Sequence, residues 1–217
     1  MPKIPTRQLL ACLLFALLCT GCNGTKSAWV YVDNGLDVEM DIEVDGASIA
    51  SISPGTFKKI EVSAGQHHLR VTAGGETLFN GPKRVDASRV VFDTQRYLFN
   101  PDSKNLYWTY NAKYGSEKIL ADAIENIHAG KDKTKSFSKL RKQFDVMPTD
   151  NWFAIPKGTV VLENASQTNS AAVINRIDPE HYKFLKSVKQ MRNPSEDDLM
   201  DLEHIFSTSV VLSLIHI

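Results

Sequence analysis

The sequence predicts an α+β protein in which an N-terminal antiparallel β-sandwich precedes a mixed, mainly helical C-terminal half. Three patterns predict this class. Apolar and acidic residues alternate over residues 36–44, turn-forming pairs punctuate residues 34–101, and apolar residues recur at helical spacing after residue 115. We therefore divide the chain into residues 1–21, 22–27, 28–114, 115–211 and 212–217.

The first segment has the composition of an export signal. It carries Lys3 and Arg7 but no acid, and an uncharged run of eleven residues follows over 9–19. A helix needs about 20 apolar residues to cross a bilayer, so this run is too short to span one. A basic start and a short apolar stretch before polar sequence predict a secretory signal peptide, with a buried core helix as the alternative.

The Gly21-Cys22 pair at the end of this run resembles the lipobox of bacterial lipoproteins. The resemblance implies that Cys22 receives a diacylglyceryl group and becomes the first residue after cleavage, which makes residues 22–27 a lipid-anchored tether. It also implies a cell-envelope location, and Asn23 resembles the outer-membrane class where the host has an outer membrane. Cys19 stands where the family prefers leucine, and a soluble export signal is the alternative.

The cysteine content and the net charge limit the chemistry of which the mature chain is capable. The three cysteines are Cys12, Cys19 and Cys22, so cleavage and acylation leave no free thiol and no disulfide. Cleavage also removes Lys3 and Arg7, after which 23 basic residues balance 25 acidic ones. This balance gives no indication of a nucleic-acid partner.

Residues 28–112 predict short strands separated by tight turns. The clearest strand is 36–44, whose period of two places one face in the core and the other in solvent. Asn34-Gly35 and Asp45-Gly46 bracket it, and both pairs favour hairpin turns. Further turn pairs lie at Pro54-Gly55, Ala64-Gly65, Gly74-Gly75, Gly81-Pro82 and Asn100-Pro101. Such regular spacing is typical of a small sandwich or barrel.

Part of this region resembles a PEGA-type module, a short β-domain of bacterial envelope proteins. The resemblance lies in a strand that ends at Asp45-Gly46, a turn at 54–56, and a Gly-x-His-x-Leu-x-Val strand over 65–71. It covers residues 36–80 and implies a β fold without indicating a ligand.

The acidic residues of strand 36–44 and the pair His67-His68 are the candidate ion ligands. Alternate strand residues lie about 6.6–7 Å apart, so the acidic side chains diverge from any single calcium ion and we expect a solvated face. Adjacent strand residues point to opposite faces, so the two histidines do not chelate one ion. We expect no metal site and no cofactor. The acids are Asp37, Glu39, Asp41 and Glu43, and their expected cross-strand partners are Lys58, Lys59 and Arg70.

Aromatic residues accumulate between positions 97 and 114. Tyr107, Trp108 and Tyr110 occupy one predicted strand, which places aromatic rings on both of its faces. We expect one face in the core and the other against the C-terminal half. A platform on which a sugar or another partner stacks is the alternative, and it makes these three residues the candidate binding residues.

After residue 115 the pattern becomes helical. Ser116 caps a predicted helix that runs to His128, and a basic stretch over 131–142 contains a second, short amphipathic helix. We expect the basic residues to form a solvated face, with contact to anionic lipid headgroups as the alternative. The apolar residues of the short helix are Phe137, Leu140 and Phe144.

Strands and helices alternate in the rest of the chain. Residues 159–162 and 171–177 predict two strands, with 164–170 as their loop. Asp178-Pro179 predicts the start of a helix that runs to residue 191. A last helix spans 193–206, and Ser207-Thr208-Ser209 then predicts a break. The expected inward positions of these helices are Tyr182, Leu185, Val188, Leu199, Leu202, Ile205 and Phe206.

The final residues look foreign to the rest of the sequence. Back-translated, Leu212 to Ile217 resemble one reading frame of a transposase end sequence used in sequencing libraries. We expect residues 212–217 to be non-native, and a terminal apolar strand is the alternative.

No catalytic motif is recognisable in the chain. It contains no nucleophile elbow, no glycine-rich phosphate loop and no His-Glu-x-x-His pattern. The sequence therefore predicts a non-enzymatic, membrane-anchored envelope lipoprotein that serves as a binding or structural module. Its expected partners are the lipid bilayer through Cys22 and an envelope protein or glycan. The alternatives are a glycan- or cell-wall-binding surface protein, and an enzyme with its site in the C-terminal half.

Overall fold

The computed structural model describes residues 26–86, 95–111, 133–156, 159–161, 172–192 and 194–214, with a few positions between 122 and 130. Several sequence predictions lie outside these ranges. They concern the signal peptide, Cys22, most of the helix predicted over 116–128, the loop 164–170 and residues 215–217.

Twelve strands and three helices make up the described part of the chain. The strands are β1 (Ser27–Asp33), β2 (Met40–Val44), β3 (Ala47–Ile52), β4 (Phe57–Ser63), β5 (Gly65–Ala73), β6 (Glu76–Val85), β7 (Arg96–Phe99), β8 (Leu106–Asn111), β9 (Phe144–Val146), β10 (Trp152–Ala154), β11 (Thr159–Val161) and β12 (Ala172–Ile177). The helices are α3 (Lys133–Arg141), α4 (Pro179–Gln190) and α5 (Glu196–Leu214). No helix in the described ranges is both long and apolar enough to cross a bilayer.

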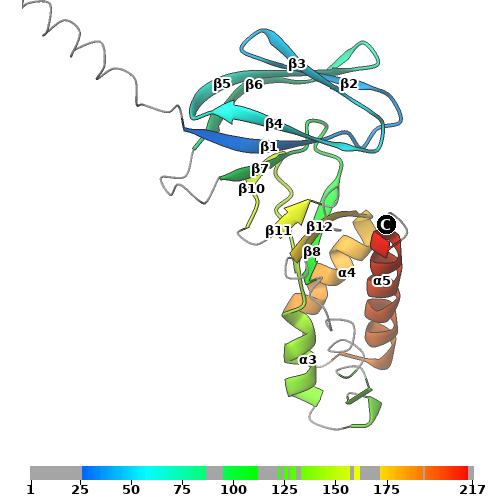
Figure 1. Ribbon diagram of the computed structural model, residues 1–217. Helices are drawn as coiled ribbons and strands as arrows, with labels where there is room; N and C mark the ends of the chain where they lie inside the picture. Colours follow the sequence, from blue (N-terminus) through cyan, green and yellow to red (C-terminus); the bar gives the residue numbers. More distant parts are fainter. Residues whose placement is uncertain are drawn as a thin grey trace, which may run out of the picture.

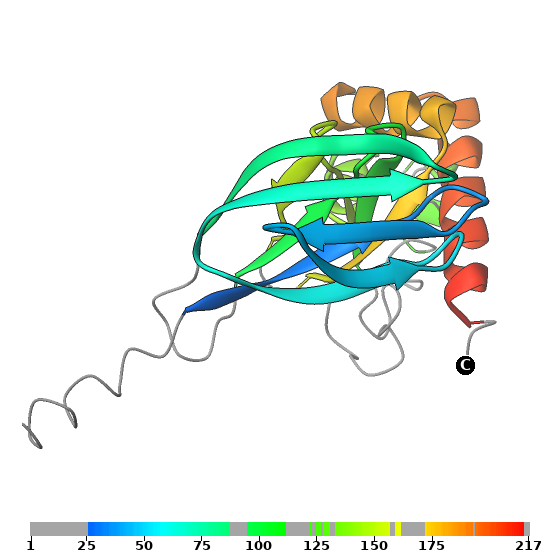
Figure 2. The same ribbon diagram turned by 90° about the horizontal axis from the view of Figure 1, so that it is seen from above.

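The strands form three four-stranded sheets that follow one another through the molecule (Figure 1). The outer sheet has the order β3-β2-β5-β6, the central sheet β10-β7-β1-β4, and the C-terminal sheet β11-β12-β8-β9. One apolar core lies between the outer and central sheets, a second between the central and C-terminal sheets, and a third between the C-terminal sheet and the helices. Figure 2, seen from above, shows the outer sheet covering the layers beneath it.

The central sheet is buried on both faces. Val30 and Val32 of β1 belong to the first core, whereas Tyr31 belongs to the second. The near-continuous apolar run over residues 28–32 reflects this double burial, because a strand covered on both faces has no polar side.

The predicted fold class is wrong in two respects. The C-terminal half is not mainly helical, because β9 to β12 lie in it and the chain is mostly β overall. The sandwich is also not purely antiparallel, since β1 pairs with β7 in parallel and β10 from the C-terminal half extends the central sheet. The strands β9, β10 and β11 contain three residues each, which is too short for a periodic sequence signal.

Strand β8 also differs from the prediction. The strand was assigned to the N-terminal sandwich of residues 28–114, but β8 pairs with β12 and β9 in the C-terminal sheet. Each face of β8 therefore enters a core formed with C-terminal residues.

Three element boundaries need correction. The strand predicted over 36–44 begins only at Met40, because the Asn34 side chain accepts from the Leu36 N–H and donates to the Val38 carbonyl, which curls residues 34–39 into a loop. Phe144 lies in β9 rather than in the short helix. The predicted break at Ser207-Thr208-Ser209 is wrong, since α5 continues to Leu214.

The predicted start of α4 is confirmed, and α5 begins with a side-chain cap of its own. The Asp178 carboxylate accepts from the N–H groups of Glu180 and His181, directly before Pro179 in the first helical turn. At α5, the Ser195 hydroxyl accepts from the Asp198 N–H while the Asp198 carboxylate accepts from the Ser195 N–H. Both arrangements satisfy N–H groups that a helix start leaves without partners. The inward positions predicted for both helices are buried.

Candidate functional site

The predicted binding residues lie in cores rather than on the surface. Trp108 and Tyr110 pack against the helices, and Trp108 contacts the Phe206 ring at a centroid distance of 5.2 Å. Tyr107 points to the opposite face and belongs to the core beneath the central sheet. Trp108 exposes only 1% of its surface, so its ring offers no face on which a sugar stacks.

Of the acidic residues predicted on strand 36–44, Asp41 and Glu43 lie in β2, Asp37 and Glu39 lie in the loop before it, and only one of the expected basic partners is found. Asp37, Glu39 and Asp41 are exposed, and Glu43 lies 3.5 Å from Arg70 on the neighbouring strand. The other two expected partners, Lys58 and Lys59, lie on β4 and pair with β1 instead.

The two histidines at 67 and 68 do not converge on a common point. The His67 Nδ1 atom lies 2.7 Å from the Asp45 carboxylate, and the His68 backbone N–H donates to the same carboxylate. Within the described ranges, no group of three His, Cys, Asp or Glu side chains has the geometry to hold a metal ion.

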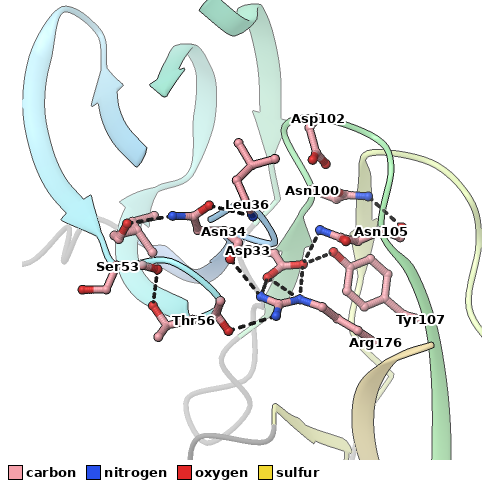
Figure 3. Close-up of polar contacts among 12 residues, drawn as sticks. Asp33, Asn34, Leu36, Ser53, Thr56, Asn100, Asp102, Asn105, Tyr107 and Arg176 are labelled. Carbon is pink, nitrogen blue, oxygen red and sulfur yellow. Dashed lines mark hydrogen bonds and ion pairs between the residues drawn. The ribbon is translucent and has the colours of Figure 1, made fainter. Parts of the chain in front are cut away.

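A buried ion pair that the sequence patterns did not indicate joins the layers of the molecule (Figure 3). Asp33 is the last residue of β1, and its side chain is fully buried. The Arg176 guanidinium on β12 donates to it through Nε, at 3.0 Å to each carboxylate oxygen, and through Nη2. This bidentate contact holds the central sheet against the C-terminal sheet.

Further groups complete the network around this pair. The Tyr107 hydroxyl and the Asn105 amide both donate to Asp33 Oδ2, the latter at 3.1 Å. Arg176 also donates to the carbonyls of Asn34 at 3.1 Å and Gly55 at 2.9 Å. The guanidinium therefore reaches β1 and the turn between β3 and β4 at once.

Burial sets the electrostatics of the network. It raises the pKa of the Asp33 carboxyl, while the hydrogen bond and charge of Arg176 act in the opposite direction. Burial and the adjacent Asp33 charge raise the pKa of Tyr107, so its phenol stays protonated and donates. For Arg176, burial acts to lower the pKa, but the hydrogen bonds and charge of Asp33 outweigh it and the pKa rises.

The network has little capacity left for chemistry on a substrate. Asp33 accepts bonds from Arg176, Tyr107 and Asn105, and Arg176 uses all three of its nitrogens. A carboxylate that accepts this many bonds at a buried position is a poor general base, because its lone pairs already point at donors. The arrangement is suited to fixing the two sheets in register.

Close backbone packing supports the same network. A Cβ added to Gly35 would lie 2.0 Å from the Asn105 amide nitrogen, so only glycine leaves room for that side chain. The buried Asn34 amide donates to the carbonyls of Val38 and Ile52 at 2.8 Å each. These bonds tie the end of β1 to the loop that follows it and to the end of β3.

A second, partly exposed polar cluster lies where the edges of the outer and central sheets meet. The Lys83 ammonium on β6 donates to the Asn151 side-chain oxygen at 2.8 Å. It also lies 4.9 Å from the Phe79 ring centroid and 5.9 Å from the Trp152 centroid. Burial lowers the pKa of Lys83, with Asp150 acting in the opposite direction. We call these four residues, Phe79, Lys83, Asn151 and Trp152, the edge cluster.

Comparison with protein-family models, with curated proteins and with solved structures finds no match. The lipobox-like pair Gly21-Cys22 and the PEGA-like segment therefore rest on their sequence motifs. The segment 36–80 contains β2 to β5 and the first half of β6. Of these strands, β4 is an edge of the central sheet and the others form the antiparallel outer sheet.

Proposed function

We propose that the protein is a non-enzymatic lipoprotein of the bacterial cell envelope, anchored through Cys22, in the outer membrane where the host has one. The observation that carries the proposal is the lipobox-like pair Gly21-Cys22 immediately before the described fold, which starts at residue 26.

The hydrogen bonding of the buried polar groups supports a binding or structural role. The one fully buried carboxylate described, Asp33, is held by Arg176 and Tyr107. The aromatic residues of β8 are core residues. In the part of the chain that the structure describes, this carboxylate and these rings thus hold layers together, which supports a module that acts through its surface.

The anchor is tested on the protein expressed with its own signal in a bacterial host. Mass spectrometry should show an N-terminal Cys22 carrying a diacylglyceryl group, and the protein should fractionate with membranes. The Cys22→Ser variant should move to the soluble fraction, whereas the control Cys19→Ser should behave like the wild type. An unmodified N-terminus, or membrane association unchanged in Cys22→Ser, would contradict the proposal.

A glycan-binding surface protein is the second candidate, and the edge cluster now supports it instead of β8. Trp152 and Phe79 are only partly buried and lie beside the hydrogen-bonding groups of Lys83 and Asn151. An aromatic ring flanked by amide and ammonium donors suits a sugar, which offers an apolar face and hydroxyl groups.

Sedimentation with insoluble cell-wall polysaccharide tests this second candidate. Trp152→Ala should abolish co-sedimentation if the edge cluster binds glycan. Lys59→Ala is a matched control, because Lys59 lies over another tryptophan ring, that of Trp29, at 4.0 Å. Equal binding by the wild type and Trp152→Ala would remove the edge cluster as a glycan site.

A further inference from the structure

The tether between the anchor and the fold is short. Five residue-to-residue steps separate Cys22 from Ser27, the first residue of β1. An extended chain covers about 3.5 Å per residue, so Ser27 stays within about 18 Å of an acylated Cys22. The end of the molecule at which β1 begins must therefore lie near the bilayer.

The strand pairing shows which other residues share that end. Ser27 pairs with Ser63, so the turn from β4 to β5 lies beside the start of β1. Val44 pairs with Leu69 and Gly65 with Val85, which brings the β2–β3 turn and the end of β6 to the same end. We call this surface the tethered end, and its exposed residues include Asp45, Gly46, Ser63, Ala64, Gly65 and Gln66.

The opposite end of β1 lies beyond the reach of the tether. Asp33 is six residues further along β1, or about 20 Å at 3.3 Å per residue. The β3–β4 turn lies there, because the Asn34 N–H donates to the Thr56 carbonyl. The helices α4 and α5 also lie toward this end of β1 in both views (Figures 1 and 2). We call it the remote end.

We propose that the lipidated protein stands on the bilayer with its tethered end against the lipid headgroups and its remote end, with α4 and α5, facing outward. The proposal rests on the proposed anchor at Cys22. A molecule turned fully over, with β1 along the bilayer normal, would hold Ser27 about 20 Å above the bilayer, whereas the tether reaches about 18 Å. The surface open to a protein or glycan partner is then the remote end and the helical layer.

Single-cysteine labelling tests the orientation on the lipidated full chain. Acylated Cys22 has no free thiol, so an introduced cysteine is the one site for a thiol-reactive fluorophore. Ala64→Cys places the probe at the tethered end and Ser53→Cys places it at the remote end, both at exposed positions. The proteins are reconstituted into phosphatidylethanolamine–phosphatidylglycerol vesicles that contain lipids with nitroxide headgroups.

We expect the headgroup nitroxides to quench the probe at position 64 several-fold more than the probe at position 53. Equal quenching, or stronger quenching at position 53, would overturn the proposed orientation. A flexible Gly-Ser insertion of about 20 residues before Lys26, with a root-mean-square span of about 25 Å, should abolish the difference. A difference that survives the insertion would overturn the short tether as its cause.

The failure of the anchor and the failure of the orientation have different signatures. If Cys22 is not acylated, the protein does not float with vesicles in a density gradient, and neither probe is quenched. If the protein floats but both positions are quenched equally, the proposed lipid anchor at Cys22 is supported and the proposed orientation is wrong.

Discussion

Arg176 and Asp33 lie 143 positions apart in the sequence, and the guanidinium of one meets the carboxylate of the other between two sheets. Arg176 is 29% exposed and Asp33 fully buried, so the pair lies just under the surface. Apolar contacts allow one sheet to slide over the other, whereas a bidentate ion pair forms at only one relative position of the two sheets. The pair therefore fixes how the C-terminal sheet docks on the central sheet.

Removing one partner of this pair should destabilise the protein. Arg176→Met leaves the Asp33 charge buried without its counter-ion, and the loss of a single partner from a buried pair costs about 3–5 kcal/mol. Urea unfolding of the non-lipidated Cys22→Ser protein, followed by tryptophan fluorescence, measures the change. The double variant Asp33→Leu with Arg176→Met should recover part of the loss, because it removes the uncompensated charge.

Arg84→Met is the matched control for this prediction. Arg84 lies 2.9 Å from Asp86, but these side chains are 75% and 69% exposed. Exposed pairs contribute about 0–1 kcal/mol, so the control should unfold close to the wild-type midpoint. Equal losses in Arg84→Met and Arg176→Met would show that the buried pair has no special role in stability.

Gly35→Ala should destabilise the fold through a steric clash with Asn105. The added methyl group would lie 2.0 Å from the Asn105 amide nitrogen, which donates to Asp33. The side chain must move and lose this bond, and overpacking of this kind costs about 1–3 kcal/mol. In an Asn105→Ala background the clashing atoms are absent, so the same substitution should have little further effect. A full loss in both backgrounds would contradict the steric explanation.

The sequence predicts those elements whose signals are local. The helix start at Asp178-Pro179 needs only neighbouring residues, and the alternation that predicts β2 needs one strand. These features were found because short-range rules determine them. The same rules placed the aromatic residues of β8 on two faces correctly but assigned the strand to the wrong sheet.

The candidate site and the sheet order depend on contacts between distant residues. Strands of three residues carry no period, and a parallel pair such as β1–β7 has no hairpin signal between its members. Arg176 did carry a usable signal, because it is the charged residue of an otherwise largely apolar strand, and a buried arginine needs an acid. Nothing in the local sequence of Asp33, which precedes a turn-forming Asn-Gly pair, marks it as that acid.

The contribution of Asp45 to stability should depend on pH. The His68 backbone N–H and the His67 side chain lower the pKa of this carboxyl below its ordinary value of 3.8. A depressed pKa means that the stabilisation is present above the unfolded-state pKa and is lost as the pH falls through the folded-state pKa. The free energies of unfolding of wild type and Asp45→Asn should therefore differ near pH 5 and converge in stronger acid.

Urea unfolding at a series of pH values checks this prediction. Asparagine suits the position because the backbone there has a φ of 53°, which asparagine adopts as readily as aspartate. A difference between the two proteins that grows as the pH falls would show that the pKa of Asp45 is raised in the folded state, against the prediction.

The last prediction concerns Trp108. Its substitution shows whether the aromatic residues of β8 stabilise a core or bind a ligand. Trp108 is 1% exposed and contacts Tyr110 and Phe206. Trp108→Ala should therefore destabilise the protein by about 3–5 kcal/mol, the usual cost of removing a buried tryptophan ring. Trp152→Ala, which truncates a partly buried ring, should cost less while affecting any glycan binding by the edge cluster. Thermal and urea unfolding give the first readout, and co-sedimentation with cell-wall polysaccharide gives the second. A Trp108→Ala protein that keeps wild-type stability but loses a glycan would show that β8, and not the edge cluster, forms the binding surface.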